Sequence, residues 1–289
     1  MVKTIGNPLS WGAGAVSGAG AMIAHGSEAM ASQDMALPEV RQLSTGDLWE
    51  ALREGFDDLT TFRSDVLMMA VIYPLVGLTL CFFAFQQALL PLLFPIAAGF
   101  ALLGPLAATG LYEMSRTRQA EGRASWADAL MLMSSPRFAP IMTLGLYLIV
   151  LYAIWLYAAA WIYSQTLGGL APAGPVEFLR LLFTTGEGWQ MIVFGNAVGF
   201  LFALTVLATG FIAFPMLVDR PVGLPVAVAT SLKAARENKA VTLTWGAMIA
   251  VLLALGSAPL FLGLIFVMPL LGHASWHLYR KAVHFPETK

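Results

Sequence analysis

Residues 139–163 read "APIMTLGLYLIVLYAIWLYAAAWIY". This segment contains no Asp, Glu, Lys or Arg. A transmembrane helix needs about 20 consecutive apolar residues, because each residue advances the helix by about 1.5 Å across a hydrocarbon core of about 30 Å. The segment alone therefore predicts a helix that crosses a membrane.

The rest of the chain extends this pattern. Of the 289 residues, 58% are hydrophobic and 11% are charged, whereas soluble domains carry about 25% charged residues. Four stretches contain no charged side chain: 66–112, 138–176, 188–218 and 240–279. At about 20 residues per span they hold six helices, which we place at 66–85, 88–111, 139–163, 190–217, 240–256 and 259–279. The fold class is therefore an all-α membrane protein with six transmembrane helices.

The basic residues predict how the chain is oriented. Fifteen of the 16 Lys and Arg residues fall before the first span, after the last, or in the loops that follow the second and fourth spans, and only Arg180 falls on the other side. Basic residues collect on the cytoplasmic side of a membrane. Both termini are therefore predicted to be cytoplasmic.

Short amphipathic segments precede the odd-numbered spans, at residues 44–65, 123–138 and 223–240. We interpret the chain as three parallel units, each a cytoplasmic surface helix followed by a transmembrane hairpin. A further surface helix is predicted on the opposite side at 175–190. The expected apolar stripes of the three cytoplasmic helices are Leu48, Leu52, Phe56 and Leu59, then Trp126, Leu130 and Met133, and then Val228, Leu232 and Ala235.

Three regions follow from these assignments. Residues 1–43 are predicted to be a flexible cytoplasmic tail, because the apolar run at 11–24 is too short to span a bilayer. Residues 44–283 form the membrane domain, and residues 284–289 a second short tail. The single cysteine, Cys81, excludes an intramolecular disulfide.

His273 and His277 are the residues most suggestive of a metal or haem site. Their spacing of four places both rings on one face of a helix. Two ligands complete only half of a tetrahedral metal site, and no other histidine is placed to complete it. Trp276 and Tyr279 beside them are typical of a membrane-water interface. We therefore interpret both histidines as interfacial anchors and expect no metal and no cofactor.

The remaining polar candidates lie in or at the ends of spans. Asn196 is expected to hydrogen-bond across helices, with the lining of a polar cavity as the alternative. Glu113 with Arg116, and Asp219 with Arg220, close the second and fourth spans. Each pair is interpreted as solvated cap charges that can form an ion pair, in preference to a gate.

Three stretches resemble a known family: "FLRLLFTTGEGWQMIVFGNAVGFLFA" (178–203), "FPMLVDRPVGLPVAVATSLKAARENKAVTLTWG" (214–246) and "PLLGHASWHLYRKAV" (269–283). They are similar to the bacterial integral membrane proteins grouped as domain of unknown function (DUF) 2189, from about Val40 to Val283. The resemblance implies a six-span inner-membrane protein. Some members are labelled as cytochrome c oxidase subunits, but the catalytic oxidase subunit holds haem and copper through histidines deep in its spans, and this chain has none there.

The sequence favours a function without catalysis. It contains no phosphate-binding loop, no dinucleotide fingerprint, no zinc-protease helix and no hydrolase elbow, and no basic patch that would bind nucleic acid. We expect a scaffold or accessory factor in the lipid bilayer that meets a protein partner at its cytoplasmic face. The alternatives are a permease or channel for a small neutral or lipid-like solute, and an accessory or assembly factor of a respiratory oxidase.

Overall fold

A computed structural model describes residues 38–61, 89–170, 172–259 and 261–286, together with positions 75, 79 and 82. The predicted first span, 66–85, lies outside the described residues except for these three positions, as does most of the predicted N-terminal tail. Within the described part the chain is helical, apart from a two-stranded ribbon of β1 (Glu39–Val40) and β2 (Val283–His284).

Three helices are long and apolar enough to cross a membrane. They are α8 (Phe138–Gln165), the run of α10 (Gly186–Gly210) and α11 (Ala213–Asp219), and α13 (Lys239–Ser257). Their length follows from the charge-free sequence predicted to span. The backbone breaks between α10 and α11, where the buried Ser231 hydroxyl donates to the Ala208 carbonyl at 2.8 Å and accepts from the Ile212 amide at 3.2 Å. This side chain satisfies the backbone groups that the break releases.

The predicted second span, 88–111, is not one helix. It is divided into η1 (Leu90–Leu92), α4 (Leu93–Leu102), α5 (Gly104–Ala107) and α6 (Thr109–Glu121). Pro105, near the start of α5, has no amide hydrogen to continue the helix. The predicted sixth span is α14 (Leu264–Ala282), which is less apolar because its last third carries polar side chains. Six spans therefore remain a prediction, and the described residues supply three clear ones.

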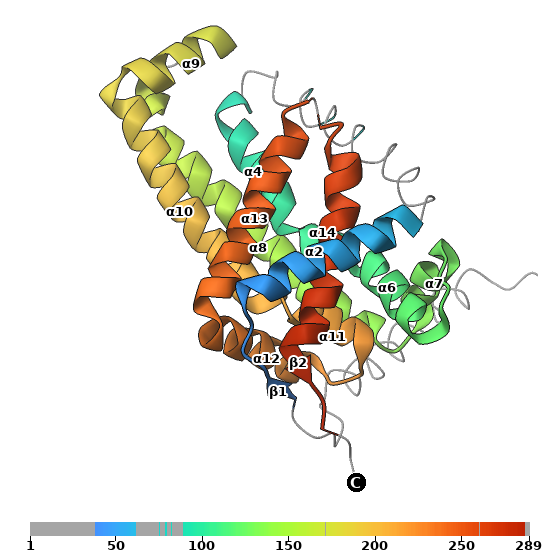
Figure 1. The fold of residues 1–289 in the computed structure, drawn as a ribbon. Coiled ribbons are helices and arrows are strands. Elements are labelled where there is room, and N and C mark those ends of the chain that lie inside the picture. The colour runs from blue at the N-terminus through green and yellow to red at the C-terminus, as the bar shows by residue number, and fades with distance from the viewer. Residues whose placement is uncertain are drawn as a thin grey trace, which may run out of the picture.

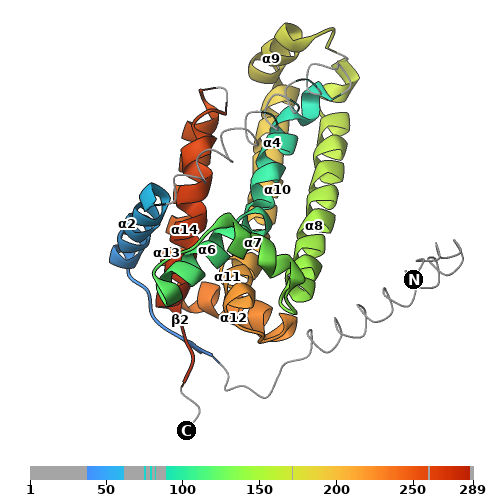
Figure 2. The same ribbon diagram turned by 90° about the vertical axis from the view of Figure 1, so that its right-hand side faces the viewer.

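The predicted surface helices are present. They are α2 (Thr45–Thr61), α7 (Trp126–Met131) with η2 (Leu132–Ser134), and α12 (Leu224–Glu237); α9 (Pro175–Thr184) follows η3 (Leu167–Leu170). Figures 1 and 2 show α9 at one end of the bundle and α12, β1 and β2 at the other, which we call the α12 end. Ser125 caps the start of α7, and its amide donates to the Asp128 carboxylate at 2.7 Å.

The predicted stripes are buried only in part, with Leu48 and Leu59 of α2 buried as expected. Phe56 of α2 is 55% exposed and Leu130 of α7 is 60% exposed. Small side chains take many of the remaining places against the protein, and several large apolar ones point outward. The small buried residues are Ala51 and Gly55 in α2, Ala129 in α7, and Ala227, Thr230, Ser231 and Ala234 in α12.

Helix α2 lies across α14 and α13 (Figure 1). The backbones of α2 and α14 nearly touch at Gly55, where a Cβ atom would lie 2.6 Å from the Ala274 nitrogen. Gly272 of α14 has no side chain and so leaves room for the Leu111 side chain of α6. These small residues let α2, α6 and α14 meet closely enough to bury polar side chains between them.

The β-ribbon corrects one predicted boundary. Residues 39–43 were expected in the flexible tail, but Val40 pairs with Val283 in an antiparallel register. The buried Asn238 amide accepts a hydrogen bond from the Leu43 amide at 2.7 Å and donates to the Arg41 carbonyl at 3.0 Å. The chain is therefore fixed to the α12 end before α2 begins.

Candidate functional site: a buried polar network beneath α2

Asp58 is the centre of a polar network between α2, α6 and α14. Its side chain is only 6% exposed. One carboxylate oxygen accepts from the Ser115 hydroxyl at 2.5 Å and lies 2.9 Å from His277 Nε2. The other oxygen accepts from the Arg118 guanidinium. A buried carboxylate requires such partners, because an unpaired charge away from water is strongly unfavourable.

The surrounding hydrogen bonds orient the two imidazole rings. Trp276 Nε1 can only donate, and it lies 3.0 Å from Gln119 Oε1. Gln119 therefore turns its amino group toward His277 Nδ1, at 3.2 Å. His277 Nε2 faces a carboxylate oxygen, which can only accept, so Nε2 donates to Asp58.

The same reasoning applies to His273. Ser115 has one hydroxyl proton, and donating it to Asp58 leaves only acceptor capacity toward His273 Nδ1, 2.8 Å away. His273 Nδ1 is therefore the donor in this contact. His277 has a second carboxylate in reach, because its Nδ1 lies 3.3 Å from Glu54.

These contacts change the acidity of Asp58. Burial alone would raise the pKa of this carboxyl group, since it disfavours the charged form. Hydrogen bonds from His277 and Ser115 and the positive charge that His273 can carry favour the carboxylate, and together they lower its pKa below the ordinary 3.8. Asp58 is therefore ionised at neutral pH.

The arrangement contains Ser, His and Asp but differs from a hydrolase triad. In a triad the imidazole lies between the nucleophilic hydroxyl and the carboxylate. Here Ser115 lies between Asp58 and His273 and donates directly to the carboxylate. Its side chain is fully buried. The hydroxyl therefore stabilises a buried charge and has neither the activation nor the access that a nucleophile needs.

The interpretation of His273 and His277 as interfacial anchors is wrong. They are 0% and 7% exposed, and the adjacent Trp276 and Tyr279 are each 1% exposed. The segment faces α2 and α6, because α2 covers the part of α14 that we expected to meet lipid. In the part of the chain that the structure describes, no three His, Cys, Asp or Glu residues are grouped to hold a metal ion. That the protein binds no metal stays a prediction.

Glu113 forms a second buried cluster. The predicted pair with Arg116 is present, with an N–O distance of 2.6 Å. Glu113 is 4% exposed, however, so it is not a solvated cap charge. Arg137 at the start of α8 also reaches it, at 3.3 Å, and donates to the Val218 carbonyl of α11. This cluster joins α6, α8 and α11.

Asp219 is bound chiefly by α14. Its carboxylate accepts from the Tyr279 hydroxyl at 2.7 Å and from Arg280 at 3.1 Å. The predicted partner Arg220 is farther away, at 3.8 Å, and its guanidinium lies over the Phe285 ring, 4.5 Å from the ring centroid. The pairing of Asp219 with Arg220 is therefore the weakest of these contacts.

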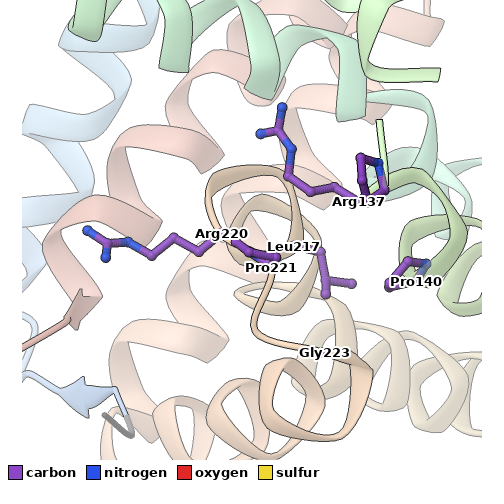
Figure 3. Close-up of a pocket in the computed structure, with 7 residues that line it drawn as sticks. Arg137, Pro140, Leu217, Arg220, Pro221 and Gly223 are labelled. Carbon is purple, nitrogen blue, oxygen red and sulfur yellow. The ribbon is translucent and has the colours of Figure 1, made fainter. Parts of the chain in front are cut away.

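A small pocket lies between the Glu113 and Asp219 clusters. Figure 3 shows Arg137 and Arg220 leaving it in different directions, with Pro140 and Leu217 in its wall. Its volume is about 40 Å³, which is space for a few water molecules and too little for an organic substrate.

Asn196 does not bond across helices as predicted. Its side chain is exposed on α10 and donates to the Ile192 carbonyl of the same helix, at 2.8 Å. Such a bond satisfies the amide without a neighbouring helix. Asn196 therefore hydrogen-bonds within its own helix instead of joining α10 to another described helix.

One family is similar to this chain. A family model described as a predicted integral membrane protein (DUF2189) matches residues 92–219, from η1 to the end of α11. Together with the three apolar helices, this match decides the class. The chain is an integral membrane protein. The resemblance predicted beyond Asp219, which includes α14 and its histidines, stays a prediction.

No curated protein and no solved structure matches the chain. The Asp58 network was not predicted from the sequence. One signal could have indicated it: Ala51, Gly55 and Asp58 share a helix face at spacings of four and three. Two small residues beside an acidic one indicate close packing on that face.

Proposed function

We propose that this membrane protein is a non-catalytic scaffold or accessory factor of the bacterial inner membrane. In this proposal the α12 end and α2 face the cytoplasm, where a protein partner binds. The supporting observation is that the acidic and histidine side chains, which could carry out chemistry, are instead used in contacts between helices. Asp58, His273, His277, Glu113 and Asp219 all hold one helix to another.

Such contacts favour rigidity over chemistry. Lys281 of α14 adds ion pairs to α2, at 3.0 Å to Glu50 and 3.4 Å to Glu54. Together with the clusters of Asp58, Glu113 and Asp219 they bind α2, α6, α8, α11 and α14 into one body. A rigid body binds a partner with little ordering entropy, because its surface is already in place.

The outward face of α2 is the surface we assign to the partner. It exposes Arg53 and Asp57, whereas Glu50 and Glu54 are drawn toward Lys281. The acidic helix has little attraction for anionic lipid. The permease alternative loses its candidate path, since Asn196 points outward from α10. An accessory role at a respiratory oxidase rests on the family resemblance and is tested by the same experiment.

Site-specific crosslinking tests this function. A photo-crosslinking residue replaces Asp57 on α2 in the full-length protein, in its native membrane. Leu201, which is 62% exposed on the apolar surface of α10, provides the matched control. We expect one protein to be captured in stoichiometric amounts at Asp57 and not at Leu201, and an oxidase subunit would identify the pathway.

Two results would refute the scaffold function. One is the absence of any adduct specific to Asp57. The other is the loss of uptake of a defined neutral solute in a deletion strain, restored by the wild-type chain, because this would make the protein a permease.

A further inference from the structure

A second polar site lies at the α12 end, outside the Asp58 network. Three arginines from distant parts of the chain converge there on a pocket of about 350 Å³. Small-molecule sites range from about 300 to 1,000 Å³. We call this site the arginine pocket, and it is lined by Arg41, Arg220, Arg280, Val283, His284 and Phe285.

The fold holds Arg41 at the pocket through its backbone. Its amide donates to the Ala282 carbonyl at 2.8 Å. Its carbonyl accepts from Asn238, a side chain that is only 4% exposed. These backbone hydrogen bonds fix the position of the Arg41 main chain. The Arg41 side chain is exposed, so its guanidinium group is available to a ligand.

The other two arginines are oriented by side-chain contacts. Arg220 stacks on Phe285, and Figure 3 shows its guanidinium leaving the small pocket on the side away from Pro140. Arg280 is held by Asp219 at 3.1 Å. The pocket is therefore largely formed before any ligand arrives, which lowers the cost of binding.

Among the described residues the charges at the pocket are mainly positive. Three arginines line it, and the Asp219 carboxylate pairs with two of them. Glu39 pairs with His284 in the β-ribbon but does not line the pocket. Like charges held together repel one another, and a bound anion removes this repulsion.

We propose that the arginine pocket binds a phosphate group. The planar guanidinium fork matches phosphate oxygens in pairs, and arginine clusters are a recurring means of binding them. The volume admits a phosphate together with an attached organic group. Two sources share this chemistry, an anionic lipid headgroup and a soluble phosphate compound. Either would give the protein a ligand-dependent surface, which goes beyond the scaffold function.

Two binding measurements on full-length protein in an uncharged detergent test the proposal. The first follows the melting temperature with inorganic phosphate against sodium chloride at equal ionic strength. The second uses native mass spectrometry after addition of phosphatidylglycerol or phosphatidylcholine. The test variants are Arg41→Gln and Arg220→Gln. The matched control is Arg236→Gln, which removes an exposed charge from α12 without touching the pocket.

We expect one of the two anions to bind the wild type and Arg236→Gln with affinities that agree within twofold. The same anion should bind Arg41→Gln and Arg220→Gln at least tenfold more weakly than it binds the wild type. Arg41→Gln is expected to melt like the wild type in chloride, since its fixed contacts are made by the backbone. Selective binding of inorganic phosphate identifies a soluble source, and selective retention of phosphatidylglycerol identifies lipid. The proposal is overturned if neither probe is preferred over its control, or if both test variants bind as the wild type does.

Discussion

Replacing Asp58 by Ala tests the network that holds α2 on the bundle. The change leaves Ser115, His277 and Arg118 without their common acceptor. Removing one member of a buried charged pair costs roughly 3–5 kcal/mol. The Arg118 side chain is 30% exposed and regains water, so we expect about 3 kcal/mol, at the low end of that range.

Hydrogen–deuterium exchange measures this loss where it occurs. In the full-length protein in mild detergent, the amides of residues 45–61 should exchange faster in Asp58→Ala, because about 3 kcal/mol raises the population of undocked α2 by roughly 100-fold. Asp57→Ala is the matched control, since it removes the same charge from the adjacent exposed position. It should change the free energy of docking by less than about 0.5 kcal/mol.

The reasoning is refuted if Asp58→Ala protects α2 as well as the wild type does, or if Asp57→Ala loosens it equally. The pH dependence gives an independent check. The folded-state pKa of Asp58 is lowered, so its contribution is present above the unfolded pKa of 3.8 and is lost as pH falls through the folded value. The difference between wild type and Asp58→Ala should therefore persist at pH 5 and shrink only below about pH 4.

Three further predictions concern other parts of the fold. Gly55→Val should undock α2, because its Cβ would lie 2.6 Å from the Ala274 nitrogen, and exchange at residues 45–61 measures this; wild-type protection would contradict the close crossing. Asn196→Leu should keep the melting temperature within about 2 °C of wild type, since the amide bonds only within α10; a large fall would show a partner across helices. Reporter fusions at Gln119 and Gly174 should read cytoplasmic and periplasmic, respectively, and a reversed reading at Gly174 would reject the six-span topology.

The apolar helices could be predicted from the sequence because their signal is local. The run at 139–163 lacks charge over its whole length, and α8 occupies Phe138–Gln165. The cap at Ser125 is equally local, since its partner Asp128 is three residues away. The break of the second predicted span was less visible, because it depends on how Gly104 and Pro105 are used within an otherwise apolar run.

The candidate site could not be predicted in the same way, because its contacts join distant residues. Asp58 and His277 are 219 residues apart. The five acidic residues of α2 look alike in the sequence, and only the docking of α2 on α14 buries Asp58 and exposes Asp57. For the same reason the aromatic and histidine residues of α14 suggested a lipid interface, although α2 and α6 cover them.

The long separation between α2 and α14 also has a consequence for biosynthesis. Synthesis proceeds at about 5–20 residues per second, so roughly 10–40 s separate the appearance of Asp58 from that of His277. During this interval α2 has emerged from the ribosome without the helix that receives it, and its small-residue face stays open to solvent, membrane surface or a chaperone. Synthesis of α14 is then the event that completes the docking site, and a chain truncated before residue 264 would present α2 permanently to quality-control proteases.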